Sequence, residues 1–227
     1  MPKRSHILAA LALLPLLAVQ TWPAADTGTP PDYTRASPES LGIRPVPPRK
    51  DPKTGFVVGG RNPTRLLAGL TEIAGRPVPD LEKDMRPGAL SGKGFLGPDE
   101  RLLDVLAADN RYVVDGRGLA RHLHVLGALA VRHASLKPLE VRYHGRRYRI
   151  RAACSRGFQD SPFRDGTRAN CDATVENLGN GKRLTYSLLV PFMVERYGFY
   201  EGTGTPYRVE PRTALEVFDF LKPARGR

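Results

Sequence analysis

The sequence has few of the residues on which metal and cofactor sites usually depend. It contains only two cysteines and five histidines, and it has no HExxH segment or tight cluster of histidines and carboxylates. A bound metal ion needs several such ligands, most often at short spacing on one helix or loop. The sequence therefore predicts no metal ion and no cofactor.

Two common catalytic motifs are also missing. The glycine-rich stretch GALSGKG, residues 88–94, places three residues between its first glycine and the Gly-Lys pair. A phosphate-binding P-loop needs four residues there, with serine or threonine after the lysine. No G-x-S-x-G segment is present, so nothing indicates a serine nucleophile of the hydrolase type. We expect residues 88–94 to form a surface loop and the chain not to bind a nucleotide.

Long uncharged apolar runs are absent except near the N-terminus. Residues 7–19 form one such run, which Lys3 and Arg4 precede by a few residues. This is the pattern of a secretory signal peptide, and the run is too short for a membrane-spanning helix of about 20 residues. A core helix would show a polar face, which this run lacks. We expect residues 1–25 to be a signal peptide and the protein to be secreted or periplasmic, with an uncleaved anchor as the alternative.

If the protein is exported, its two cysteines, Cys154 and Cys171, are expected to be oxidised. Oxidising compartments favour pairing. Closing a loop of this length would stabilise the fold by about 3 kcal/mol in the chain-entropy description. Free thiols in the core or a metal site are the alternatives, but no further metal ligands lie nearby. The sequence predicts a structural disulfide.

Proline is concentrated in one region. Residues 26–54 are rich in proline and lack apolar periodicity, which is typical of an extended, semi-rigid tether. A single α+β domain is expected over residues 55–222, followed by a basic tail at residues 223–227.

The domain changes its hydrophobic period halfway along. Helical spacing of leucines predicts about three helices, over residues 62–75, 98–110 and 117–135. Residues 139–152 and 173–186 then alternate on either side of the turns HG and GNG, as antiparallel hairpins do. A short strand near residues 205–211 and a final helix near residues 212–221 complete an α+β fold.

Basic residues outnumber acidic ones by 35 to 23, and they gather in the first hairpin. Alternation places Tyr148, Ile150 and Ala152 inside and the polar residues outside. That explains why the outer residues are polar but not why most of them are positive, since like charges across a hairpin repel each other. We therefore expect an anion-binding surface made of five residues, namely Arg142, His144, Arg147, Arg149 and Arg151.

Three functions remain open. The first is an exported, non-catalytic bacterial protein that binds an anionic envelope component or a protein partner through this basic hairpin. The second is a secreted hydrolase acting on an anionic polymer, with the carboxylates of Glu195 and Glu201 as candidates. The third rests on the order of the elements, because three helices followed by a basic hairpin resemble a winged-helix protein. Nucleic acid is not an expected partner of an exported chain, and membrane contact would be peripheral or through the N-terminal segment.

Overall fold

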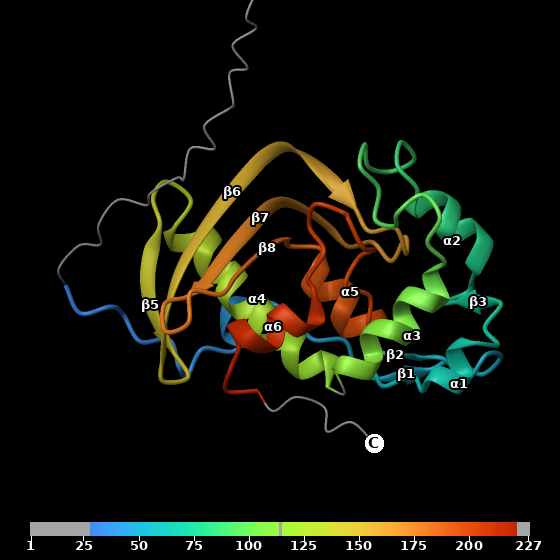
Figure 1. Cartoon of the computed structure of the whole chain (residues 1–227), viewed down its shortest axis with the longest axis horizontal. Coiled ribbons are helices and arrows are strands. Elements are labelled where there is room, and N and C mark those ends of the chain that lie inside the picture. The colour runs from blue at the N-terminus through green and yellow to red at the C-terminus, as the bar shows by residue number, and fades with distance from the viewer. Residues whose placement is uncertain (1–27, 114, 222–227) are drawn as a thin grey trace, which may run out of the picture.

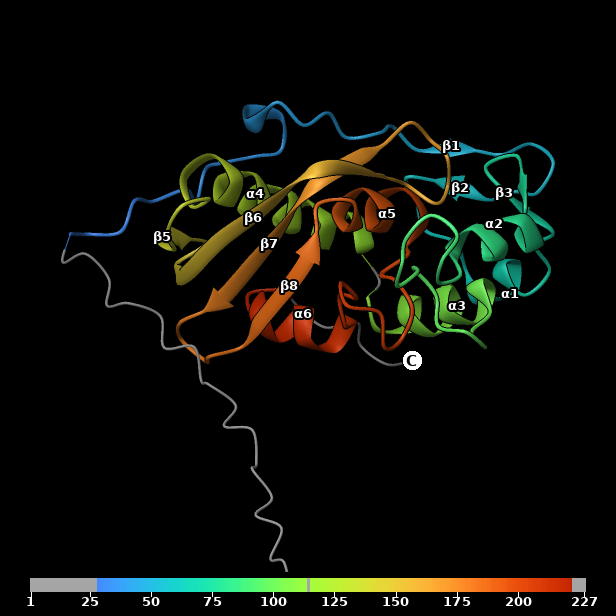
Figure 2. The ribbon, with the colours of Figure 1, turned by 90° about the horizontal axis from the view of Figure 1, so that it is seen from above.

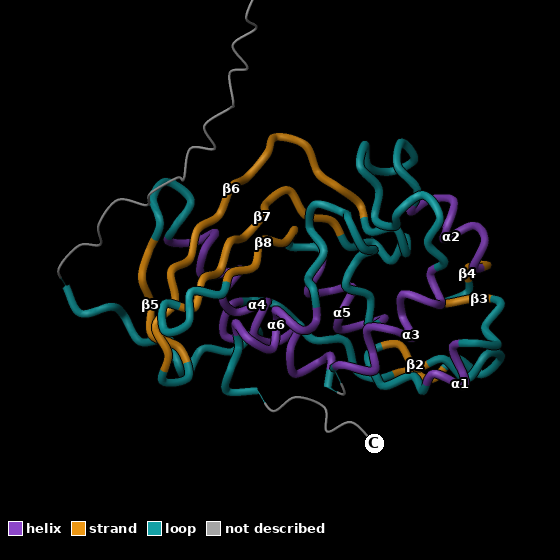
Figure 3. Tube along the Cα trace, in the orientation of Figure 1, coloured by secondary structure: helices purple, strands orange, loops and turns teal. Residues whose placement is uncertain are grey.

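The computed structural model describes residues 28–113 and 115–221, so the expected signal peptide and basic tail lie outside the described residues. The fold is a mixed α+β arrangement, as the sequence predicts (Figure 1). A four-stranded antiparallel sheet and three helices form one part, while short strands and three further helices gather beside it (Figure 3).

The main sheet is formed by two hairpins in sequence order. Its strands are β5 (Leu139–Tyr143), β6 (Arg146–Asp160), β7 (Arg168–Asn177) and β8 (Arg183–Ser187). Val141 pairs with Tyr148 and Ala173 with Tyr186, which confirms both predicted hairpins and their turns. The alternating apolar residues are buried, including Val141, Tyr148 and Ile150 at 0% exposure. The alternation of apolar and polar residues along the strands therefore determines which face of the sheet is buried.

One long helix covers the inner face of this sheet. Helix α4 (Gly116–His133) begins at Asp115, whose side chain accepts a hydrogen bond from the backbone N–H of Gly118. Ten of its residues are buried. A Cβ atom on Gly127 would lie 2.7 Å from Leu188 Cδ2, so glycine allows a close approach of α4 to its neighbour. The burial of ten of the 18 residues of α4 does not favour the winged-helix alternative, because α4 would be the recognition helix and a recognition helix exposes its side chains to a DNA groove.

Two shorter helices pack beside α4 and the sheet. Helix α5 (Val190–Tyr197) has Pro191 in its first turn, where proline is tolerated, and it packs on α4. Helix α6 (Pro211–Val217) contacts β7 and β8. The short strand expected near residues 205–211 is wrong: this segment is a loop with turns, and Arg208 within it bonds to the side chain of Asp109.

The first predicted helix is mostly wrong. Helix α1 spans only Thr64–Leu67, and Ile73 lies in β3 (Glu72–Ile73), which pairs with β4 (Arg76–Pro77). Asn62 does not cap the helix, because its amide bonds to the backbone N–H and C=O of Val57. Gly69 weakens helix continuation, and Ala74–Gly75, both at positive φ, form a tight hairpin turn instead.

The other elements of the N-terminal half include only one that the sequence predicted, the helix over residues 98–110. They are the 3₁₀ turn η1 (Glu39–Leu41), strands β1 (Arg49–Lys50) and β2 (Val57–Val58), and helices α2 (Val78–Met85) and α3 (Leu102–Tyr112). Helix α3 begins later than expected because Glu100 accepts hydrogen bonds from the backbone N–H groups of Gly97 and Thr203. Its carboxylate therefore joins two loops rather than opening the helix.

The described part of the proline-rich segment runs along the domain. Near its start, Tyr33 N–H donates to the carbonyl of Arg142, and Arg142 N–H donates to the carbonyl of Pro31, both at 2.8 Å. The segment thereby adds a short parallel bridge at the edge of β5. It then follows α4 toward β1 (Figure 2), and the carbonyl of Leu41 accepts a hydrogen bond from Arg132. The domain boundary at residue 55 stays a prediction.

A disulfide joins Cys154 to Cys171 on directly opposite positions of β6 and β7, as predicted. Beyond this pair the register of the two strands shifts before Gln159 meets Ala169. The bond therefore holds the strands together where their regular pairing stops.

Replacing both cysteines with alanine is expected to lower the free energy of unfolding by about 3 kcal/mol, because the unfolded chain regains the freedom of a loop between residues 17 apart. For a chain of this size the melting temperature should fall by roughly 6–12 °C. Thermal unfolding followed by circular dichroism measures the change, and reduction of the parent should produce a similar loss. Alkylation of two thiols in the unreduced, unfolded parent would contradict the bond.

Candidate functional site

The outer face of the main sheet carries most of the predicted basic residues. Arg142 on β5 stands directly opposite Arg147 on β6, and Arg149 and Arg151 follow Arg147 on the same face. Arg183 on β8 lies on this face too and was missed from the sequence, because the second hairpin contributes only one arginine there. Seen from above, no helix of the described residues covers these strands (Figure 2).

The two glutamates of this face, Glu140 and Glu176, both pair with the same arginine. Arg149 lies 2.9 Å from Glu140 Oε1 and 3.5 Å from Glu176 Oε2, so both glutamates meet one arginine. Within residues 28–113 and 115–221, no ion pair within 4 Å is formed by Arg147, Arg151 or Arg183. All three are exposed. The outer face therefore keeps three exposed arginines outside ion pairs after Arg149 has engaged both glutamates.

His144 is not brought together with the arginines. It occupies the turn between β5 and β6 at positive φ, and its ring stacks on Phe220 with centroids 4.7 Å apart. It also meets the edge of His122. Burial and the positive charge of Arg121 lower the pKa of His144. The lowered pKa disfavours the charged form of His144, and the structure brings together four of the five predicted residues.

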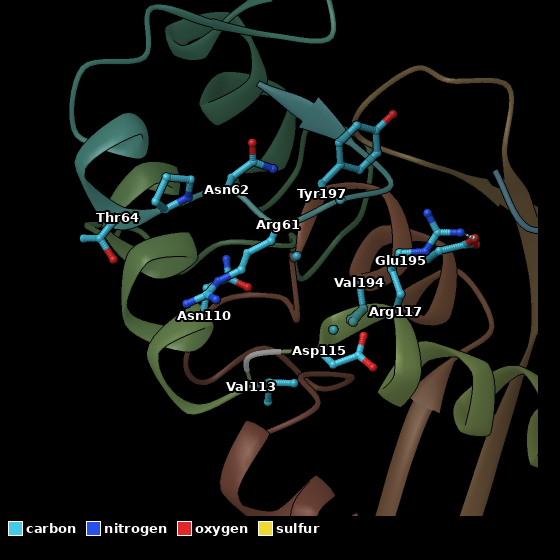
Figure 4. Close-up of a pocket in the computed structure, with 14 residues that line it drawn as sticks. Arg61, Asn62, Thr64, Asn110, Val113, Asp115, Arg117, Val194, Glu195 and Tyr197 are labelled. Atoms are coloured by element: carbon cyan, nitrogen blue, oxygen red, sulfur yellow. Dashed lines mark ion pairs between the residues drawn. The ribbon is translucent and has the colours of Figure 1, made fainter. Parts of the chain in front are cut away.

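Glu195 lies in a different region, on α5 and facing the start of α4. The backbone N–H of Val46 donates to its Oε1 at 3.0 Å, and Arg117 Nη2 lies 3.9 Å from the same oxygen. Arg117 and Glu195 face each other beside the pocket drawn in Figure 4. This pocket has a volume of about 110 Å³, and an adjoining one of about 360 Å³ is also lined by both residues.

His124 on α4 is the neighbour of Glu195 that the sequence did not indicate. Its Nε2 lies 3.7 Å from Glu195 Oε2, and both side chains are 5% exposed. Neither of these two atoms has a hydrogen-bond partner among the described residues. The separation is too long for a direct hydrogen bond. Glu195 thus sits in a buried polar cluster, held by a backbone N–H from the proline-rich segment.

Glu201 lines a different pocket, with a volume of about 260 Å³. It is 2% exposed, and its Oε2 accepts a hydrogen bond from Thr205 at 3.0 Å. Burial raises the pKa of Glu201 to about 8. None of the residues lining this pocket lines either pocket beside Glu195. The structure therefore does not place the two predicted carboxylates in a shared cleft.

Two further residues near Glu201 were missed from the sequence. Asp172 is half-buried on β7, and the hydroxyl of Tyr207 donates a hydrogen bond to its carboxylate. The negative charge of Asp172 disfavours ionisation of Glu201, and both carboxylates disfavour ionisation of the Tyr207 hydroxyl, whose pKa is raised. The sequence marks these two residues only by their neighbours. Asp172 directly follows a cysteine, and Tyr207 ends the glycine-containing segment YEGTGTPY.

Comparisons with known proteins add no functional information, since no protein-family model, no curated protein and no solved structure matches the chain. Across the described part of the chain, no helix is long and apolar enough to span a bilayer. Within that same part, no three histidine, cysteine or carboxylate side chains are grouped so that they could hold a metal ion. Functional inference therefore rests on the geometry of the basic face and the two pocket regions.

Proposed function

We propose that the chain is an exported bacterial protein that binds an anionic polymer of the cell envelope through the outer face of its main sheet. We define this basic face by the side chains of five arginines, namely Arg142, Arg147, Arg149, Arg151 and Arg183. The observation that carries the proposal is the excess of arginine over carboxylate on an uncovered sheet.

The arrangement is unfavourable without a ligand. Directly opposite residues on antiparallel strands have Cβ atoms about 4.5–5.5 Å apart, and like charges there destabilise the pair. Arg142 and Arg147 are such a pair. Both nearby glutamates are engaged by Arg149. An anionic polymer would relieve the repulsion and gain from several arginines at once, since guanidinium groups bind carboxylate and phosphate groups in a forked geometry.

Two further observations support export. Residues 1–25 have the composition of a secretory signal. The Cys154–Cys171 bond is of a kind that persists in oxidising compartments and is rare in the cytosol of most organisms. An anionic component of the envelope is the class of partner that a strongly basic exported protein would meet first.

Changing Arg147, Arg151 and Arg183 together to alanine is expected to weaken binding to polygalacturonate on the order of 100-fold at low salt, at about 1 kcal/mol for each arginine near an anionic surface. Biolayer interferometry on immobilised polymer, with neutral dextran alongside, measures the loss. Affinity of the parent should fall steeply as salt is added.

A matched control is a second triple variant in which Arg65, Arg101 and Arg111 become alanine. These arginines are also exposed, and they lie on or beside α1 and α3. The control lowers the net charge equally but leaves the basic face intact, so it should bind nearly as well as the parent. Equal losses in the two variants, or no binding of the parent at low salt, would refute the proposal.

A further inference from the structure

The basic face leads into the pocket that contains Glu201. Arg151 is opposite Thr174 on β7, and Asp172 is the next residue of β7 on the same face. Ser187, which is opposite Asp172 on β8, lines the pocket. Diagonal neighbours in a sheet are about 7–8 Å apart. A polymer lying along the arginines of β6 would therefore reach the pocket without leaving the sheet.

Two loops form the other walls of this pocket. One is the glycine-rich loop between α2 and α3, which supplies Lys93 and stands beside the far ends of β6 and β7 (Figure 1). Gln159 at the end of β6 donates a hydrogen bond to the carbonyl of Leu90 in this loop at 3.1 Å. The other is the loop that carries Glu201 and Tyr207. The pocket is thus lined by polar side chains from both loops and from the ends of β6 and β8.

Glu201 is held in an unusual state inside this pocket. Its backbone has φ of 68°, a region that favours glycine, and such strain persists only where the surroundings enforce it. Thr205 hydrogen-bonds to Oε2, while Oε1 has no hydrogen-bond partner among the described residues. Because burial raises the pKa of Glu201 to about 8, the carboxyl is protonated at neutral pH. It can therefore donate a proton from within the pocket.

Asp172 does not itself line the pocket but contacts two residues that do, Ser187 and Tyr207. It is only half-buried, and although burial raises its pKa, the hydroxyl of Tyr207 donates a hydrogen bond that favours the ionised carboxylate. Lys93 lines the same pocket and is available to an anionic group of a ligand. A buried, protonated carboxyl beside a second carboxyl that is more exposed is the kind of pair that glycoside hydrolysis requires.

We propose that this pocket hydrolyses a glycosidic bond of an acidic polysaccharide held by the basic face, with Glu201 as general acid and Asp172 as general base. Glu201 gives its proton to the glycosidic oxygen as the bond from that oxygen to the anomeric carbon breaks. Water forms the new bond to that carbon, and Asp172 accepts the proton that the water loses. One water is consumed, and proton exchange with solvent restores both carboxyl groups.

This inference rests on the proposed function, because the basic face must first hold the polymer. The step itself needs a carboxylic acid, since the sugar oxygen is a poor leaving group unless it is protonated. The basic face and the two carboxyl groups together indicate an acidic polysaccharide as substrate. Its carboxylates would bind the arginines, and one of its glycosidic bonds would be cleaved in the pocket.

The test uses the whole mature chain with polygalacturonate, alginate and hyaluronate as probes. New reducing ends are counted, and binding of the same polymers is measured in parallel. Glu201→Gln and Asp172→Asn are each expected to lower the rate of reducing-end release at least on the order of 100-fold while binding is kept. The rate of the parent should fall as pH rises through about 8, because Glu201 then loses its proton.

The controls are Glu216→Gln and Asp104→Asn, which make the same chemical changes on the exposed surfaces of α6 and α3 and should leave the rate unchanged. If the parent binds a polymer but releases no reducing ends, the hydrolytic inference is wrong while the binding proposal stands. If none of the polymers binds, the proposed function fails first. Release that survives in both Glu201→Gln and Asp172→Asn would assign the cleavage to other residues.

Discussion

Replacing Arg208 with alanine is expected to lower the free energy of unfolding by about 3–5 kcal/mol. Arg208 Nη2 lies 2.7 Å from Asp109 Oδ1, and Nη1 lies 3.0 Å from Oδ2, so the pair is joined by two hydrogen bonds. The side chains are 12% and 5% exposed. Without the guanidinium, the carboxylate of Asp109 would remain buried and unpaired. Burial already raises the pKa of Asp109, so the loss should be smaller at acidic pH.

Urea denaturation of parent and variant measures this change. Arg146→Ala is the matched control, because Arg146 Nε lies 2.8 Å from Asp219 Oδ1 in an ion pair whose side chains are 44% and 38% exposed. An exposed pair of that kind contributes about 0–1 kcal/mol. Equal effects of the two substitutions would show that burial does not distinguish the pairs. The carbonyl of Glu201 also accepts a hydrogen bond from Arg208, so the variant should loosen the loop that holds Glu201.

The buried carboxyl of Glu201 is expected to make the free energy of unfolding depend strongly on pH. Its pKa is raised from 4.5 to about 8 in the folded protein. The folded state therefore holds a proton that the unfolded state releases between these two values, and the free energy of unfolding falls as pH rises through that range. Above pH 8 the accumulated loss is about 3–5 kcal/mol.

Glu201→Gln removes the titrating group and keeps an acceptor for Thr205. We expect the variant to match the parent near pH 4 and to be more stable than the parent at pH 9, and denaturant melts across this range measure the difference. Glu216→Gln, at an exposed position, should follow the parent at every pH. Parallel curves for parent and Glu201→Gln would mean that Glu201 ionises normally in the fold.

The hairpins could be predicted because their signal is local. Alternation of polar and apolar residues fixes both the strand and the face, so Val141 and Ile150 were placed correctly from neighbouring residues alone. The helix expected over residues 62–75 failed for a tertiary reason. The amide of Asn62 has a better use on the backbone of Val57, and the Ala74–Gly75 turn competes with the helix.

The candidate sites were only partly visible in the sequence. The four arginines of the first hairpin share a face because of the strand period, but the engagement of Glu140 and Glu176 by Arg149 depends on the pairing of three strands. Asp172, Tyr207 and Glu201 come from separate parts of the chain, and no spacing rule joins them. Glu195 and Glu201, by contrast, are near in sequence and line separate pockets because α5 ends between them.

The bridge between the proline-rich segment and β5 also affects self-association. An uncovered edge strand offers free backbone N–H and C=O groups to any other strand, including one from a second copy of the chain. Here Thr34 Oγ1 accepts a hydrogen bond from the N–H of His144 across 110 residues. Contacts between residues this far apart in sequence have a large entropic cost of loop closure, and they therefore form slowly during folding. The edge that limits aggregation of the finished protein is therefore among the last to be covered, and newly made chains are most prone to aggregate before that segment docks.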